Sequence, residues 1–127
     1  ANCPIVNWMS AMGTSDAISY TRTFETPFWE NAEEWMDRSS IFHVGSVTTP
    51  TMLMTGENDL RTPMGQTEEF YQALQYLGVP TVMVRFQDEW HGTSSKPSNF
   101  LRTQLYLRKW FGKWGTHRSD MARRLSS

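Results

Sequence analysis

The strongest constraint on the fold is a pair of short apolar runs, at residues 51–55 and 81–86, each followed by a polar loop. The first run lies between Pro50 and Gly56, and the second is rich in β-branched side chains. Runs of this length between turn-forming residues are typical of buried strands. The sequence therefore predicts two strands whose carboxyl ends lead into loops that carry polar groups.

Each of these runs is followed by a helical pattern. In the first, Thr62 and Pro63 are typical of a cap and a first helical position, and Gly78 of a helix end. The second is expected to begin at Ser98 and to end at Gly115. Both patterns have an apolar face, made by Phe70, Leu74 and Leu77 in the first and by Phe100, Thr103, Leu107, Trp110, Phe111 and Trp114 in the second.

Strands that alternate with helices at this spacing predict an α/β fold with a parallel sheet covered on both faces. We expect a third short strand at residues 2–6 and an irregular segment at residues 7–38. Within that segment, Asn31 and Glu34 form a capping-box pattern that opens a short helix. The expected architecture is a three-layer α/β/α domain over residues 1–115 with about three parallel strands, followed by a polar tail over residues 116–127.

Composition narrows the classes of function. The net charge is −1 and the isoelectric point is near 6.3, which excludes the basic surface of a general nucleic-acid binder. No apolar run approaches the roughly 18 residues that cross a membrane. The single cysteine, Cys3, excludes an internal disulfide and a zinc site built from several thiolates, and favours a reducing, cytoplasmic location. We interpret Cys3 as a small buried side chain in a strand, because the local sequence supplies no histidine to activate it.

The two loops at the strand ends hold the groups most suited to chemistry. Asp59 lies in the first loop and His91 in the second. Since neighbouring strands lie about 4.8 Å apart, a carboxylate from one loop reaches an imidazole from the other. In such a pair the carboxylate fixes the tautomer of the imidazole, which then acts as a general base.

Other interpretations of these loops remain open at this point. Asn-Asp after a strand is also ordinary turn chemistry, and a loop histidine commonly has no catalytic role. A metal site made by Asp59, Glu89 and His91 is a further alternative, although the helical spacing of paired histidine ligands is missing. His43 and His117 have no identifiable acidic partner, so we interpret both as non-catalytic.

A resemblance to a known family, over residues 1 to about 114, favours the catalytic interpretation of these loops. The loops Gly56-Glu57-Asn58-Asp59-Leu60-Arg61-Thr62-Pro63 and Glu89-Trp90-His91-Gly92 resemble those of the prolyl-oligopeptidase family of serine peptidases. The other motifs in order are Pro4…Asn7-Trp8…Ser10…Gly13-Thr14-Ser15-Asp16, Thr49-Pro50-Thr51, Gln66…Glu69-Phe70-Tyr71…Ala73-Leu74…Gly78-Val79-Pro80 and Trp110-Phe111. The sequence is most similar to the acylaminoacyl-peptidase and dipeptidyl-aminopeptidase-like branch.

This resemblance implies an α/β-hydrolase fold with a triad in the chain order Ser, Asp, His. Asp59 and His91 match the triad aspartate and histidine. Arg61 matches an arginine that binds a substrate backbone carbonyl, although a surface ion pair is an equal alternative. Trp8 is expected either to line the pocket for the residue before the cut bond or to pack in the core. Trp90 departs from the glycine of many members and either narrows the entrance or packs.

The larger departure is an absence: the nucleophile motif Gly-x-Ser-x-Gly does not occur in these 127 residues. Ser39, Ser40, Ser94 and Ser95 lie in turn-like contexts and do not replace it. We expect the carboxyl-terminal part of a hydrolase of peptide or acyl-ester bonds, inactive alone, without a cofactor, and completed by a preceding segment that carries the serine. The alternative is a non-catalytic α/β module that self-associates, most simply as a homodimer, through an unpaired sheet edge.

Overall fold

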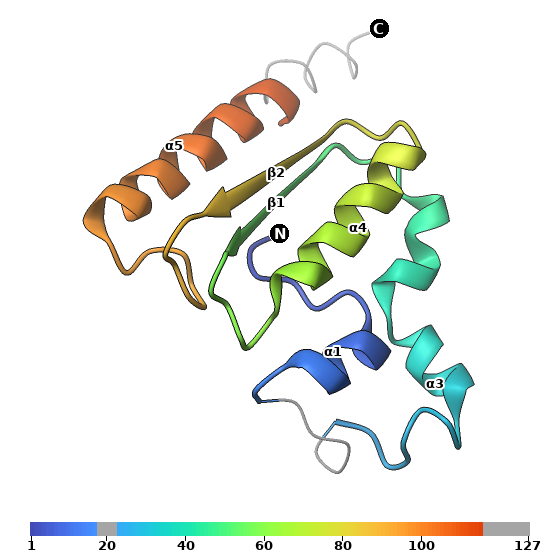
Figure 1. Ribbon diagram of the computed structural model, residues 1–127. Coiled ribbons are helices and arrows are strands. Elements are labelled where there is room, and N and C mark those ends of the chain that lie inside the picture. Colours follow the sequence, from blue (N-terminus) through green and yellow to red (C-terminus); the bar gives the residue numbers. More distant parts are fainter. Residues whose placement is uncertain (18–22, 116–127) are drawn as a thin grey trace, which may run out of the picture.

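The computed structural model describes residues 1–17 and 23–115 (Figure 1). The predicted tail over residues 116–127 therefore lies outside the described residues. None of the helices within the described ranges combines the length and the apolar composition that crossing a bilayer requires. The elements in chain order are α1 (Trp8–Thr14), α3 (Ala32–Asp37), the 3-10 helix η1 (Ser40–Ser46), β1 (Thr51–Gly56), α4 (Met64–Tyr76), β2 (Thr81–Phe86) and α5 (Pro97–Trp114).

The two strands predicted from the apolar runs are confirmed. β1 and β2 pair in parallel, in a register that runs from Thr51 opposite Thr81 to Gly56 opposite Phe86. Parallel neighbours need a crossover, and α4 supplies it. The helix ends where expected, since Gly78 has a φ of +71° and follows its last turn.

The helix starts differ by one residue from the sequence-based expectation. α4 begins at Met64, so Pro63 takes the cap position and Thr62 lies outside the helix. The reason is that the Thr62 hydroxyl donates to the carboxylate of Asp59 and is not used as a cap. α5 begins at Pro97, one residue before the predicted Ser98, and its last residue, Trp114, is followed by Gly115 as the cap, which is the predicted helix end.

The predicted third strand at residues 2–6 is wrong. Within the described residues this segment makes only an isolated parallel bridge, between Asn2 and Met54. Two features stop the pairing there. Cys3 has a φ of +46°, which turns the chain out of the extended conformation, and Pro4 has no N–H to donate. The sheet of the described chain therefore has two strands, where about three were predicted.

The sheet lies between two helices, as Figure 1 shows, so the predicted three-layer arrangement is present around two strands. On one face, the Thr55 hydroxyl hydrogen-bonds to that of Thr67 on α4. On the other face, α5 packs through Leu107 and Trp110 against a cluster of buried residues, which are Met52, Met54 and Phe86. Alternate residues of β1 thus face different helices, which is the two-residue period of a strand.

Two strands are too few to cover all of the predicted apolar helix faces. Leu74 on α4 is fully buried, but Leu77 is 42% exposed. On α5, Thr103 is buried, whereas Phe100 and Phe111 are 50% and 64% exposed. The apolar period of each helix is real, but only the part that faces β1 and β2 is buried.

The segment predicted as irregular, residues 7–38, contains α1 and α3. The predicted cap is confirmed, since the side chain of Asn31 accepts from the Glu34 N–H at 3.5 Å. These helices enclose a separate small core made of Met12, Phe24 and Trp35, with the last two rings stacked at 3.8 Å between centroids. Aromatic packing holds this part together in place of a sheet.

Gln66 joins this segment to α4. Its side chain is buried, and its Oε1 accepts from the backbone N–H groups of Val6 and Asn7 at 3.0 and 2.9 Å. Its Nε2 donates to the hydroxyl of Ser10 at 2.7 Å. One glutamine thereby satisfies two backbone N–H groups just before α1 and joins this segment to α4.

Candidate active site

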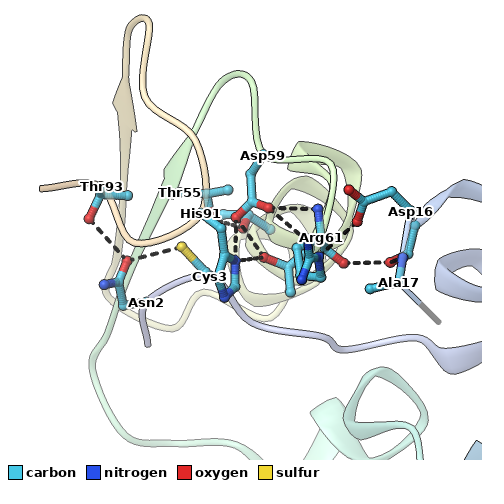
Figure 2. Close-up of polar contacts among 12 residues, drawn as sticks. Asn2, Cys3, Asp16, Ala17, Thr55, Asp59, Arg61, His91 and Thr93 are labelled. Atoms are coloured by element: carbon cyan, nitrogen blue, oxygen red, sulfur yellow. Dashed lines mark hydrogen bonds and ion pairs between the residues drawn. The ribbon is translucent and has the colours of Figure 1, made fainter. Parts of the chain in front are cut away.

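The carboxyl ends of β1 and β2 bring Asp59 and His91 together. The Nδ1 atom of His91 lies 3.0 Å from Oδ2 of Asp59 (Figure 2). Asp59 comes from the turn that follows β1, and His91 from the loop that follows β2. The contact expected from adjacent strand ends is present in the structure.

Asp59 is buried, with 2% of its surface exposed. Its Oδ1 accepts from the backbone N–H groups of Arg61 and Thr62, both at 2.9 Å, and its Oδ2 from the Thr62 hydroxyl at 2.8 Å. Burial by itself raises the pKa of Asp59, but the hydrogen bonds from Thr62 and His91 outweigh it and hold the pKa below its usual range. The carboxylate is therefore ionised and fixed in orientation.

His91 differs from its partner in being open to solvent. Its side chain is 53% exposed, against 0% for the side chain of Asp59. Nδ1 faces the ionised carboxylate, so this nitrogen carries the proton and Nε2 carries the lone pair. Within the described part of the chain, Nε2 has no hydrogen-bond partner. The ring thus presents a free basic nitrogen on the side opposite Asp59.

Gly56 allows the two loops to approach. A Cβ atom at this position would overlap the backbone of Glu89 and Trp90. Beside it, the N–H of Asn58 donates to the carbonyl of Glu89 at 2.9 Å. The last residue of β1 has to be glycine because the histidine loop lies directly against it.

Glu89 fastens the histidine loop to the start of α5. Its side chain is 1% exposed, and its carboxylate accepts from the hydroxyl and N–H of Ser95, from the N–H of Lys96 and from the amide of Asn99. Burial opposes the charge, but these donors lower the pKa of Glu89 to about 2. Its positioning role was missed from sequence, although an acidic residue shortly before a helix start is a usable signal.

Residues with left-handed backbone lie on both sides of His91. Asp88, Gly92 and Thr93 all have positive φ angles, of 58°, 108° and 56°. A β-branched residue rarely adopts this conformation. Thr93 is nevertheless buried, and its hydroxyl donates to the side-chain oxygen of Asn2 at 3.4 Å. Packing thus holds Thr93 in a backbone conformation that its β-branched side chain does not favour.

The prediction for Cys3 is wrong. The residue is half-buried and lies outside any strand. It is next to Asp59 and His91, although both are far from it in the sequence. Its Sγ, a carboxylate oxygen of Asp59 and a ring nitrogen of His91 all lie within 4.8 Å of one another. Burial raises the pKa of the Cys3 thiol, and a hydrogen bond to Asp59 raises it further. A protonated thiol on the Asp59 side of the ring is not placed as a nucleophile.

The alternative metal site made by Asp59, Glu89 and His91 is also wrong, because Glu89 is not part of the cluster. The Glu89 carboxylate is engaged by the start of α5. Within residues 1–17 and 23–115, the cluster with metal-ligand spacing contains Cys3 in its place.

Arg61 and Trp8 are both in structural contacts. Arg61 Nε donates to Oδ1 of Asp16 at 2.8 Å, in an ion pair that is about half exposed. This is the surface ion pair weighed as the alternative for Arg61. Trp8 opens α1 and packs edge-on against Phe24, with ring centroids 5.7 Å apart. The substrate-binding roles of both residues stay predictions.

The remaining candidates lie apart from the pair. Trp90 is 57% exposed, so its ring is not packed into the core. His43 has an acidic neighbour after all, since its Nε2 lies 2.7 Å from the carbonyl and 4.0 Å from the carboxylate of Asp37. The sequence hid this contact because η1 folds back on α3. His117 lies outside the described residues.

Two of the four turn serines, Ser39 and Ser95, have hydroxyls that are already engaged. Ser39 is buried and donates to the carbonyl of Trp35 at 2.6 Å. Ser95 donates to Glu89. In the described ranges, no serine hydroxyl is hydrogen-bonded to His91. The pair thus has a base without a nucleophile beside it.

Comparisons with known proteins show which sequences this chain resembles. The sequence profile described as the Prolyl oligopeptidase family matches residues 1–117. An uncharacterized peptidase of Bacillus subtilis, YuxL, is 35% identical over 112 residues, which cover 84% of this chain and 17% of the relative. The acylamino-acid-releasing enzyme of Mus musculus is 32% identical over 124 residues, covering 88% of this chain and 17% of that enzyme. The chain therefore spans about a sixth of the length of these relatives.

Solved structures show the same fold. The acylaminoacyl peptidase of Pyrococcus horikoshii, in its uncomplexed form, superposes with a TM-score of 0.81 at 22% identity, over 89% of this chain and 19% of its own. A puromycin-hydrolyzing peptidase of Mycobacterium tuberculosis gives a TM-score of 0.71 at 22% identity, over 91% and 18% of the two chains. The two parallel strands and their helices thus match part of an α/β-hydrolase peptidase structure.

Proposed function

The chain belongs to the prolyl oligopeptidase family, and we propose that it supplies the aspartate and histidine of a serine-peptidase triad. The observation that carries this proposal is the state of the pair: a buried, ionised Asp59 holds Nδ1 of His91, and Nε2 stays free. The nucleophilic serine comes from outside these 127 residues, which contain no Gly-x-Ser-x-Gly motif.

The chemistry follows from the two nitrogens of His91. As the serine oxygen attacks the carbonyl carbon of a peptide or acyl ester, Nε2 takes the serine proton. Asp59 stabilises the imidazolium that forms, because its carboxylate is already aligned with Nδ1. When the tetrahedral intermediate collapses, Nε2 returns the proton to the leaving group and an acyl-enzyme remains. Water then attacks the acyl-enzyme with His91 as base again, which releases the acid and restores the serine.

Arg61 and Trp8 extend the proposal to the substrate. The ion pair with Asp16 uses Nε of Arg61 and fixes the guanidinium plane, so the terminal Nη groups are the donors for a substrate carbonyl. Trp8 would line the pocket for the residue before the cut bond. Names of the relatives, such as acylamino-acid-releasing enzyme, favour peptide substrates over small esters. The sequence-based expectation of a cytoplasmic location stays with this proposal.

The test is active-site labelling of the protein encoded by the complete reading frame. A fluorophosphonate should modify a serine outside these 127 residues, because only a serine activated by a triad attacks phosphorus readily. His91→Ala should abolish labelling. His43→Ala is the matched control and should label normally, since His43 lies on η1 next to Asp37. Full labelling of the His91 variant would contradict the assigned role.

A second candidate function has one observation in its favour. Beside the outer edge of β1, an open groove is lined by apolar side chains that include Met52, Leu107 and Phe111. If the reading frame holds no serine motif upstream, this edge would serve a non-catalytic module that self-associates as a homodimer. Light scattering at micromolar concentration tests it: a dimer supports the module, and a monomer contradicts it.

A further inference from the structure

Cys3, Asp59 and His91 form a cluster that the peptidase chemistry does not use in full. They come from three separate segments, and Figure 2 shows their side chains converging. One sulfur, one carboxylate oxygen and one ring nitrogen lie within 4.8 Å of one another. We propose that this cluster binds a thiophilic divalent cation of the zinc type, and that the bound ion inhibits the peptidase. The inhibitory half rests on the function proposed above; the binding half does not.

The ligand set selects the class of ion. Thiolate and imidazole favour zinc and similar soft or borderline ions, whereas magnesium and calcium prefer oxygen ligands alone. In a tetrahedral zinc site, bonds of about 2.0–2.3 Å place neighbouring ligand atoms about 3.5 Å apart. Oδ2 of Asp59 and Nδ1 of His91 are already 3.0 Å apart. Side-chain shifts of about 1 Å therefore close a site whose widest separation is 4.8 Å.

The surroundings fix each ligand in place. The backbone N–H of Cys3 donates to the carbonyl of Met54 at 2.8 Å, which ties its position to β1. Asp59 is oriented by the hydroxyl and N–H of Thr62. His91 lies between residues with left-handed backbone, in a loop that Glu89 anchors. Supporting hydrogen bonds of this kind are what orient ligands in established metal sites.

The protons balance as follows. The thiol of Cys3 releases one proton to solvent and becomes a thiolate. The ring of His91 stays neutral but changes tautomer, so that Nδ1 offers its lone pair to the ion and Nε2 carries the hydrogen. Asp59 binds as the carboxylate that it already is. Three protein ligands leave the fourth position to water.

Inhibition follows from the change of tautomer. In the active pair, Nδ1 donates to Asp59 and Nε2 is free to accept the serine proton. With the ion bound, Nδ1 is occupied and Nε2 is a donor, so His91 no longer acts as a base. The ion does not need to touch the substrate or the serine.

The binding half is tested with Cd²⁺ on the complete protein, because cadmium thiolate has an ultraviolet charge-transfer band. The wild-type spectrum minus that of Cys3→Ser isolates the signal of this cysteine. His91→Gln should weaken the cadmium affinity by about 10- to 100-fold. His43→Gln is the matched control and should leave it unchanged. If wild type and His91→Gln bind cadmium with equal affinity, the ion is held without His91, by the Cys3 thiolate alone, and the proposal is overturned.

Asp59→Asn gives a second ligand test, with circular dichroism to show that each variant is folded. The inhibitory half is tested by fluorophosphonate labelling at increasing Zn²⁺, with each variant normalised to its own zinc-free labelling. The Zn²⁺ concentration that halves labelling should rise at least tenfold in Cys3→Ser. Labelling that is equally sensitive in both overturns inhibition through this site. Cadmium binding that depends on all three residues, in a protein that never labels, supports the metal site and contradicts the proposed function.

Discussion

Two regions of the molecule are held together in different ways. Residues 51–115 pack around the parallel sheet, and their polar groups are fixed by partners a few residues away, such as Thr62 for Asp59 and Ser95 for Glu89. Residues 1–17 and 23–50 add a second core around the stacked rings of Phe24 and Trp35. Their ties to the sheet region join residues far apart in the sequence, such as Cys3 with Met54 and Asp16 with Leu60.

The difference shows how the site is assembled. The pair itself comes entirely from residues 51–115, so its geometry depends on two strand ends and one helix start. The first region adds groups around it: Cys3 beside His91, and Asp16 against Arg61. The catalytic pair is thus built within residues 51–115, and the groups that surround it come from residues 1–17.

Of the variants that test this difference between the two regions, Asp59→Asn should have the largest effect, a fall in kcat. Asparagine keeps the shape but loses the charge that stabilises the imidazolium, so kcat for a chromogenic peptide substrate of the complete protein should fall by about 10³- to 10⁴-fold. Asp88→Asn is the control, because the Asp88 side chain is 70% exposed and outside the pair. Similar losses in both variants would mean that the loop as a whole, and not the buried charge, supports the reaction.

Gly56→Ala should break the contact between the two loops that follow β1 and β2. A methyl group there overlaps the backbone of Glu89 and Trp90, so the free energy of unfolding should drop by about 3 kcal/mol. Gly65→Ala on α4 has open space around it and should instead be stabilising by about 0.5–1 kcal/mol. Urea unfolding of the two variants measures both. Equal midpoints would show that the loops do not need close approach.

Glu89→Gln tests the anchor of the histidine loop through the pH dependence of stability. The folded-state pKa of Glu89, about 2, lies below its ordinary value of 4.5, so its contribution to stability is present above pH 4.5 and is lost as pH falls toward 2. The variant should lose about 2 kcal/mol at neutral pH, the worth of hydrogen bonds to a charged group. It should also show a flatter decline between pH 4.5 and 2. Asp88→Gln is the exposed control; an unchanged acid profile in Glu89→Gln would contradict the anchor.

Gln66→Ala should have the smallest effect, because it weakens one of several ties between the two regions. Losing the acceptor of Val6 and Asn7 should cost about 1–2 kcal/mol of unfolding free energy. Gln72→Ala, on the exposed face of the same helix, should stay within about 0.5 kcal/mol. Hydrogen exchange should show faster exchange at residues 6–14 in Gln66→Ala. Unchanged protection there would mean that aromatic packing alone holds the first region.

Sequence reasoning was accurate where the determining interactions are local. The strand runs, Gly78, Gly115 and the Asn31 cap were all predicted correctly, since apolar period and turn chemistry act within a few residues. The contact of Asp59 with His91 also followed from strand order alone. The predicted strand at residues 2–6 failed for one reason that no local pattern reveals, the left-handed backbone of Cys3, and for one that the sequence does show, the missing N–H of Pro4.

The sequence by itself determined the two parallel strands, their helices and the family to which the chain belongs. It also determined the Asp59–His91 pair, because consecutive parallel strands bring their carboxyl ends to one edge. Only the tertiary structure decided that Cys3 lies at that edge, that Glu89 anchors the histidine loop and that Arg61 pairs with Asp16. These contacts join side chains from separate segments of the chain. They form only when the segments pack against one another, and no periodic pattern in the sequence records that packing.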